Sequence, residues 1–335
     1  MNDQENMRSL PTASPVVDSR TCPVVDQDTQ AFLDEFTQTG GLGPHELGND
    51  LASAKLNAIQ RSLISQPITQ ADDVLIVSQK YGEVNIRIIR PEHSIGPLPI
   101  VIYLHGGGWA MGGWQSHGLL ATTLAIDSGF AVVFVNYSTM PETRFPTQNE
   151  QAYAAICYVV DHATALDLDN TRIAVVGDGA GGNMAAAVSL MTKRRRGPII
   201  TLQVLLYPIL GVPDGTASYS EFKNGPWVTA EAMRRYIREQ FSDHDISQHE
   251  ALPAGAPFTA LEGMPTTLII TAENDVVRDE GEAYARKLIQ AGVPVTATRF
   301  LGCIHDFMML EPLADSHATR SAVRQVISML KAALI

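Results

Sequence analysis

Six mostly apolar runs, separated by stretches with helical periodicity, constrain the fold of this chain more than any other feature. The runs are PIVIYL (99–104), FAVVFVN (130–136), RIAVVGD (172–178), TLQVLLYP (201–208), TTLIITAE (266–273) and VTATRF (295–300). Strands that are buried on both faces are apolar throughout. Helices are predicted at 147–163, 181–195, 279–291 and 314–333. This alternation predicts an α/β fold, with a mostly parallel sheet that helices cover on both faces.

The segments before and within this series differ from it. Residues 28–63 show helical periodicity with Asn49 as a candidate cap, and the first 25 residues form a polar arm. Around the turn Tyr81-Gly82, an apolar run and an alternating run predict an antiparallel hairpin. Residues 209–260 interrupt the alternation with Pro, Gly and aromatic residues, and a helix is expected to start at Thr229.

These boundaries predict three units. We expect residues 1–70 to form an N-terminal arm and cap helices, and 209–260 to form a cap insertion over the strand ends. Residues 71–208 and 261–335 then form the α/β core. In such sheets the working residues lie on loops at the carboxyl ends of the strands.

Composition excludes several classes of protein. Of 335 residues, 45% are hydrophobic, which excludes a disordered chain, and the net charge of −12 argues against a nucleic-acid partner. No apolar run reaches the roughly 18 residues of a membrane span, so no membrane insertion is expected. The N-terminus has no apolar core typical of a signal peptide, and the three cysteines form no metal or disulfide pattern. We therefore expect a cytoplasmic protein without a metal.

Gly-rich segments follow two of the predicted strands. HGGGW (105–109) can turn tightly and point backbone N–H groups into a cavity, where they could hold a developing oxyanion. Three glycines alone favour an ordinary turn, but HGGG after a strand is far more specific. His105 is interpreted as a buttress of this loop. GDGAGGN (177–183) occupies the strand–helix turn where serine hydrolases carry Gly-x-Ser-x-Gly, with Gly179 at the nucleophile position.

Two titratable residues follow later strands. Asp275 lies just past a strand, where a carboxylate can orient a histidine, and His305 in GCIHDF is the candidate base. Asp279 and Glu280 have a simpler interpretation as first-turn carboxylates of the next helix. A lone loop histidine is more often a surface residue, but the order of HGGG, elbow, Asp and His favours a catalytic role.

Together these segments resemble the hormone-sensitive-lipase family of α/β-hydrolase carboxylesterases. The resemblance covers about residues 70–333 and rests on HGGGW, VNYSTMPETRFP, GDGAGGN, TAENDVVRDEGEAYA and GCIHDF. It implies an eight-stranded, mostly parallel sheet with a helical cap. It also implies Asp275 and His305 as members of a Ser-Asp-His triad, with an oxyanion hole formed by the amides of Gly107, Gly108 and Ala180.

The chain departs from this family at the nucleophile. Gly179 has no side chain, so the acyl-enzyme route is closed and an inactive or nearly inactive esterase is expected. The intact surroundings favour an engineered knockout, and a natural pseudoenzyme that binds a small molecule or acts as a receptor is the alternative. Glycine tolerates the strained turn, so the fold should not suffer.

The resemblance further implies a short- to medium-chain or aryl ester as substrate. Family members often form dimers through an edge strand, so a homodimer is an expectation for this chain. No cofactor is expected, because the sequence shows no metal-ligand spacing. Candidate pocket walls are the large apolar residues near HGGGW and in the cap insertion: Trp109, Met111, Trp114, Phe222, Trp227 and Met233. GDGAGG also matches the dinucleotide pattern GxGxxG, but residues 197–213 hold no acidic residue to bind a ribose, which argues against that interpretation.

Overall fold

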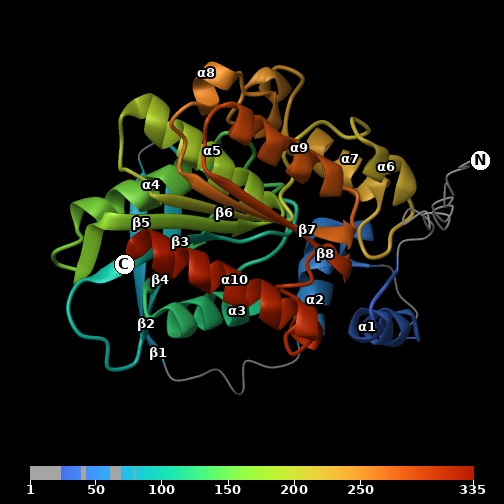
Figure 1. The fold of residues 1–335 in the computed structure, drawn as a ribbon, viewed down its shortest axis with the longest axis horizontal. Coiled ribbons are helices and arrows are strands. Elements are labelled where there is room, and N and C mark those ends of the chain that lie inside the picture. Colours follow the sequence, from blue (N-terminus) through green and yellow to red (C-terminus); the bar gives the residue numbers. More distant parts are fainter. Residues whose placement is uncertain (1–23, 39–42, 61–68, 79) are drawn as a thin grey trace, which may run out of the picture.

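An eight-stranded sheet forms the centre of the molecule (Figure 1). The computed structural model describes residues 24–38, 43–60, 69–78 and 80–335. The strands are β1 (Thr69–Ser78), β2 (Gly82–Pro91), β3 (Leu98–Leu104), β4 (Ala131–Asn136), β5 (Leu168–Asp178), β6 (Leu202–Leu206), β7 (Thr266–Asn274) and β8 (Val295–Ile304). Their order is β1-β2-β4-β3-β5-β6-β7-β8. Strands β3 to β8 are parallel, whereas β1, β2 and β4 pair antiparallel, which confirms the predicted hairpin.

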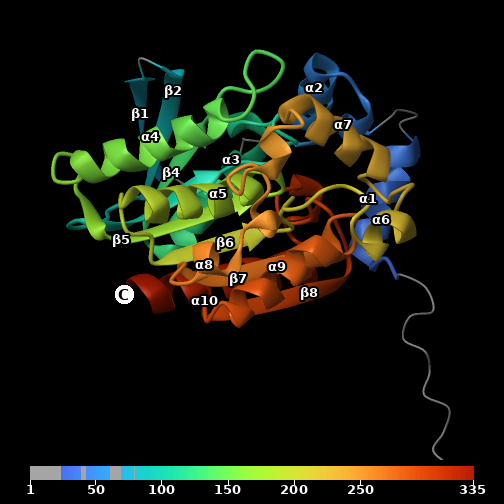
Figure 2. The same cartoon turned by 90° about the horizontal axis from the view of Figure 1, so that it is seen from above.

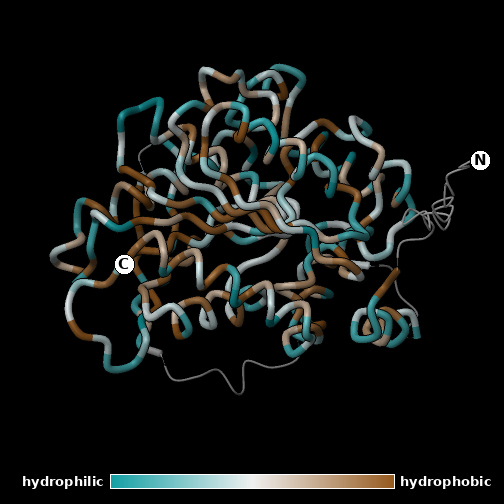
Figure 3. The backbone as a smooth tube through the Cα atoms, viewed as in Figure 1, coloured by the Kyte–Doolittle hydropathy of each residue, from teal (hydrophilic) through white to brown (hydrophobic). Residues whose placement is uncertain are grey.

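Helices cover both faces of the sheet, as predicted. Figure 1 shows α3 and α10 on one face and α4, α5 and α9 on the other. Their bounds are α3 (Trp114–Ser128), α4 (Thr147–Asp161), α5 (Ala180–Arg195), α9 (Arg278–Gln290) and α10 (His317–Leu334). Hydrophobic residues gather along the central strands (Figure 3), because helices shield both faces of β3 to β7 from water.

Most of the remaining helices lie beyond one end of the strands (Figure 2). From the N-terminal part come α1 (Gln27–Gln38), the 3-10 turn η1 (Pro44–Glu46) and α2 (Asn49–Ile59). The stretch between β6 and β7 contributes α6 (Ala217–Glu221), α7 (Ala230–Gln240), η3 (Asp245–Ser247), η4 (Pro253–Gly255) and α8 (Phe258–Leu261). Arg235 of α7 donates to the carbonyls of His45 and Leu47, so the two groups of helices contact each other directly.

Two details differ from the sequence-based expectation. Asn49 is the first residue of α2 and not its cap, because the extended residue Gly48 precedes it. Helix α3 was not predicted, because its polar and apolar residues are mixed around the helix and form no amphipathic pattern. The predicted arm at residues 1–25 lies largely outside the described residues.

No helix in the described part of the chain is both long enough and apolar enough to cross a membrane.

The expected helix start at Thr229 is confirmed and can be tested. Its hydroxyl accepts a bond from the Ala232 amide at 3.2 Å. Thr229→Ala should lower the free energy of unfolding by about 1 kcal/mol, because an N–H at the start of α7 loses its acceptor. Urea unfolding measures this change. Thr229→Ser keeps the hydroxyl and serves as control; equal losses in both variants would contradict a capping role.

Candidate active site

Four loops meet where the parallel strands end. The segment that begins at His105 follows β3, Gly179 follows β5, Asp275 follows β7, and His305 follows β8. Because carboxyl ends of parallel strands share one edge of a sheet, residues far apart in sequence come together there.

His305 and Asp275 form a buried pair. The imidazole Nδ1 lies 2.7 Å from Asp275 Oδ2, and the two residues are 3% and 2% exposed. The Val277 amide donates to the second carboxylate oxygen at 3.1 Å, which fixes the carboxylate. Burial alone would lower the pKa of His305, but the charges of Asp275 and Asp306 raise it to about 9. The imidazole is therefore oriented and strongly basic.

Gly179 lies directly in front of His305. Its φ of 50° and ψ of −113° place it on a sharp turn between β5 and α5. A Cβ built there would lie 3.3 Å from His305 Nε2, so any side chain at this position starts at the imidazole. Cβ-bearing residues rarely adopt this conformation, whereas glycine does so at little cost. The turn is therefore compatible with glycine and strained for serine.

The neighbouring glycines allow α5 to approach the sheet. A Cβ on Gly181 would collide with the Leu104 carbonyl at the end of β3. Asp178, beside Gly179, points away from this turn and accepts a 2.7 Å bond from the Tyr103 hydroxyl. Close packing thus accounts for the spaced glycines that also match a dinucleotide pattern.

The loop after β3 presents backbone N–H groups beside this turn. Among the residues that the structure describes, no acceptor takes the N–H of Gly107 or Gly108. Ala180 is the first residue of α5, so its N–H has no acceptor within the helix. Gly106 Cα lies 4.0 Å from the Cβ position of Gly179, which places the loop against the turn. These amides are available to a ligand atom.

His105 buttresses this loop, as expected from the sequence. Its Nδ1 lies 2.9 Å from the Gly106 carbonyl, and its ring stacks on Tyr137 at 4.2 Å. The Tyr137 hydroxyl donates to the His105 carbonyl at 2.7 Å. Burial lowers the pKa of His105 to about 3, so the ring is neutral and structural.

The six predicted pocket residues lie in different places. Trp109 is buried edge-on against Phe241, and Trp227 donates from Nε1 to Asp306 at 3.0 Å, next to His305. Trp114 instead packs on Phe134 of β4 and on the Arg87 guanidinium of β2, so its ring covers the sheet and does not line a pocket at the site. The other three are buried: Met111 in the loop after β3, Phe222 under the Arg278 guanidinium, and Met233 on α7.

Four site residues were not predicted from the sequence. Tyr207 contacts His305 edge-on at 5.1 Å between ring centroids, and the Tyr236 ring lies over Gly108. His45 and Asp306 bond to each other at 3.0 Å. Only the position of Asp306 after His305 offered a signal, because the other contacts join segments that are distant in sequence.

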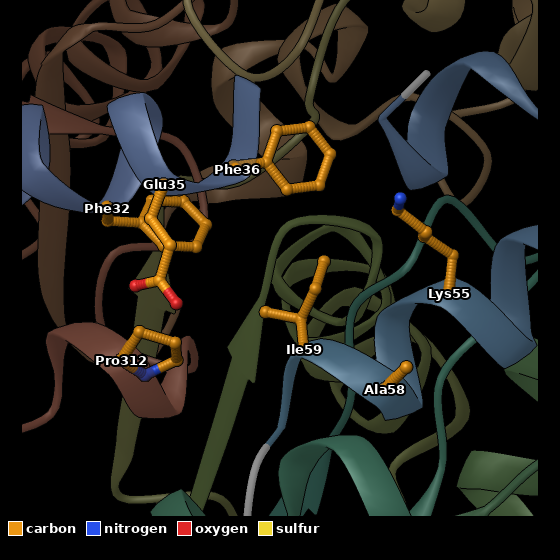
Figure 4. Close-up of a pocket in the computed structure, with 7 residues that line it drawn as sticks. All are labelled: Phe32, Glu35, Phe36, Lys55, Ala58, Ile59 and Pro312. Atoms are coloured by element: carbon orange, nitrogen blue, oxygen red, sulfur yellow. The ribbon is translucent and has the colours of Figure 1, made fainter. Parts of the chain in front are cut away.

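A pocket opens between α1 and α2 (Figure 4). Phe32 and Phe36 form one wall, with Ile59 opposite, and Lys55 and Glu35 supply the charged groups. The rings of Phe32 and Phe36 both contact the Trp227 indole, at 5.3 and 5.4 Å. The Trp227 indole therefore lies between the rings that line this pocket and the residues around His305.

Three further reactive or acidic residues near the site, Cys303, Asp279 and Glu280, make contacts that indicate structural roles. Cys303 contacts Asp26 at 3.8 Å, and burial raises the pKa of its thiol to about 12, which disfavours a nucleophilic thiolate. Asp279 accepts from the Ser218 amide, and the buried Glu280 accepts from the Leu210 amide. Both carboxylates hold the loop after β6 against α9, beyond the simple helix-start role expected from the sequence.

With this geometry described, comparison with known proteins assigns the family. The family model described as alpha/beta hydrolase fold matches residues 101–309, so the chain belongs to the α/β-hydrolase family. The carboxylesterase NlhH of Mycobacterium tuberculosis is 30% identical, over 93% of this chain and 97% of that protein.

Solved esterases agree closely with the fold. A thermostable esterase from Pseudomonas putida superposes with a TM-score of 0.88 at 38% identity, over 94% of this chain and 99% of that one. A serine-to-alanine mutant of the esterase rPPE, solved in complex with (S)-Ac-CPA, superposes with a TM-score of 0.90, also at 38% identity and over 94% and 99% of the two chains.

The strained turn predicts a stability difference. Gly179→Ser should lower the free energy of unfolding by about 1–3 kcal/mol, because φ at this residue is +50° and a Cβ meets His305. Thermal and urea unfolding of both chains measure this difference. Gly255→Ser is the control, since nothing lies within 4 Å of a Cβ there. A serine form as stable as the parent would contradict the strain.

The raised pKa of His305 predicts pH-dependent stability. A histidine that binds its proton more tightly when folded stabilises the protein fully below about pH 6.5, and this contribution is lost as the pH rises through about 9. The unfolding free energy of the parent minus that of His305→Gln should therefore fall between pH 6.5 and 9. Urea unfolding at several pH values measures it. Thr229→Ala, which removes no titratable group, is the control, and its difference from the parent should not change with pH.

Proposed function

We propose that this chain is a carboxylesterase-type hydrolase whose nucleophile side chain is missing at Gly179. The observation that carries the proposal is the 3.3 Å between His305 Nε2 and the position where a side chain at residue 179 would begin. Asp275 behind the imidazole and the unpaired amides of Gly107 and Gly108 support the same chemistry. The esterases among its relatives support it independently.

A serine at position 179 would complete this machinery. His305 would take the hydroxyl proton as Oγ attacks the ester carbonyl, while Asp275 stabilises the imidazolium. The amides of Gly107, Gly108 and Ala180 would hold the developing oxyanion. His305 then returns the proton to the leaving alcohol, and water cleaves the acyl-enzyme by the same steps.

With glycine, the covalent route is closed but binding is not. The amides, His305 and the cap contacts all remain, so an ester can be held without forming an acyl-enzyme. Where a triad member is removed, about 10³- to 10⁴-fold acceleration over water can persist. The rPPE mutant crystallised with (S)-Ac-CPA supports this interpretation, since a serine there is also replaced by a small residue.

The state of the site favours a recent loss of serine. Asp275, His305 and both glycine loops keep a working arrangement, which fits an engineered knockout better than a long-abandoned site. The alternative is a natural small-molecule binding protein. Restoring serine separates the two, because an engineered knockout should regain full turnover.

The apolar side chains around the site support the proposed substrate class. Phe32, from the pocket between α1 and α2, contacts Trp227 beside the site. Trp109 and Met233 supply further buried apolar groups. These surroundings favour an ester with a short or medium acyl chain or an aryl group.

Hydrolysis of aryl acetates and butyrates tests the proposal. Gly179→Ser should raise kcat/KM at least about 10³-fold over the parent, because the covalent route reopens. Gly179→Ala is the matched control and should stay near the parent rate. Mass spectrometry should detect an acyl adduct on the serine form only. If the serine form stays at background, or the glycine form becomes acylated, the proposed function is wrong.

A further inference from the structure

The carboxylate of Asp306 lies at the point where three parts of the chain meet. Its Oδ2 accepts from His45 Nε2 and from Trp227 Nε1, each at 3.0 Å. Its Oδ1 lies 3.5 Å from His305 Nε2, whereas Asp275 contacts the other ring nitrogen, Nδ1. Asp306 is only 4% exposed, so water does not screen these interactions.

The two donors belong to different cap segments. His45 lies on η1 of the N-terminal segment, and Trp227 lies two residues before the cap residue of α7. His45 Nδ1 also lies 3.2 Å from the Tyr236 hydroxyl on α7. Arg235 donates to the His45 carbonyl at 3.0 Å, which holds the same two segments together from the other side. One buried acceptor therefore receives bonds from both halves of the cap.

We propose that Asp306 is a positioning residue, whose single buried carboxylate directs His305 Nε2 toward position 179 and fastens both cap segments above it. This inference rests on the proposed function in one respect: it takes His305 to be the base of the reaction. Asp275 accepts from the imidazole at Nδ1, and the second carboxylate attracts the opposite end of the ring at Nε2.

The same arrangement couples the proton on His305 to the cap. Several titratable groups lie near enough to act on the imidazole: Asp275 after β7, Asp178 from β5, Glu280 from α9, Tyr207 after β6, His45 from η1 and Asp306. Burial raises the pKa of Asp306, but His305 and the bonds from His45 and Trp227 lower it well below its usual range. Asp306 thus stays charged, and removing its charge should lower the pKa of His305.

Asp306 is also well suited to an isosteric test. Its φ of +66° lies in the left-handed region, which asparagine adopts nearly as readily as aspartate. Asp306→Asn keeps an oxygen that can accept from Trp227 and His45, while it removes the charge. Asp306→Ala removes both, and Trp227→Phe removes one donor but keeps the ring and Asp306.

The first experiment measures the imidazole directly in the glycine chain. NMR titration of ¹⁵N-histidine-labelled protein, with His305→Gln to assign the signal, gives the pKa of His305 without any turnover. Asp306→Asn should lower this pKa by at least one pH unit. Asp73→Asn, which removes an exposed carboxylate on β1, is the control and should leave it unchanged. An unchanged pKa in Asp306→Asn would overturn the electrostatic half of the proposal.

The second experiment measures the cap. Hydrogen exchange of residues 44–47 and 230–240 should be faster in Asp306→Ala than in the parent, and Asp306→Asn should lie close to the parent. Trp227→Phe should accelerate exchange in the cap, and it should lower the pKa of His305 less than Asp306→Asn does. This variant keeps the test decisive if Asp306→Ala does not fold. Exchange unchanged in both Asp306→Ala and Trp227→Phe would overturn the cap contact.

Kinetics in the Gly179→Ser background complete the test. Adding Asp306→Asn should move the acid limb of kcat/KM to lower pH by about the shift seen in the titration, because His305 must be neutral to accept a proton. If Gly179→Ser itself is inactive, the proposed function fails, while the titration and exchange results still decide the role of Asp306. An acid limb that stays in place despite a shifted titration would overturn the proposed role.

Discussion

The buried imidazole of His305, held between two carboxylates, is the interaction on which the rest of the site depends. A cationic ring at 3% exposure would be costly to bury alone, and the charges of Asp275 and Asp306 offset that cost. Each carboxylate also needs its own hydrogen-bond donors. Asp275 takes an amide from its own loop, and Asp306 takes donors from both cap segments. The charge on the imidazole is therefore linked, through Asp306, to His45 of the N-terminal segment and to Trp227 before α7.

The glycine at position 179 fits this arrangement without disturbing it. Its backbone has the left-handed φ of a strained turn, and the imidazole in front of it keeps its partners. A side chain at position 179 would strain the turn, whereas the pairing of His305 with its carboxylates does not involve residue 179. Glycine at this position therefore removes the nucleophile and leaves the geometry for binding in place. Stability and catalysis thus change in opposite directions at one residue. The proposed hydrolase with a missing nucleophile follows from that separation.

Much of the fold was predictable from local patterns. Runs such as 99–104 and 130–136 are apolar throughout because strands in the middle of a covered sheet have no wet face. The helix start at Thr229 was predictable because a hydroxyl cap is a local interaction. Helix α3 was missed for the converse reason: its polar and apolar residues are mixed around the helix, so no amphipathic period marks it. The cap of α2 was assigned to Asn49 because a side-chain cap was expected, whereas extended Gly48 precedes the helix without one.

The sequence by itself determined the parts of the site that lie on short contiguous motifs. HGGGW, the glycine frame around residue 179, Asp275 and His305 each follow a strand, so topology alone brings them to one edge. Only the tertiary structure decided how His45, Trp227 and Asp306 join, because their bonds link residues 79 to 261 positions apart. Such contacts depend on how the N-terminal helices and the segment around α7 pack against each other and against the loop after β8, and no local periodicity or spacing encodes that packing.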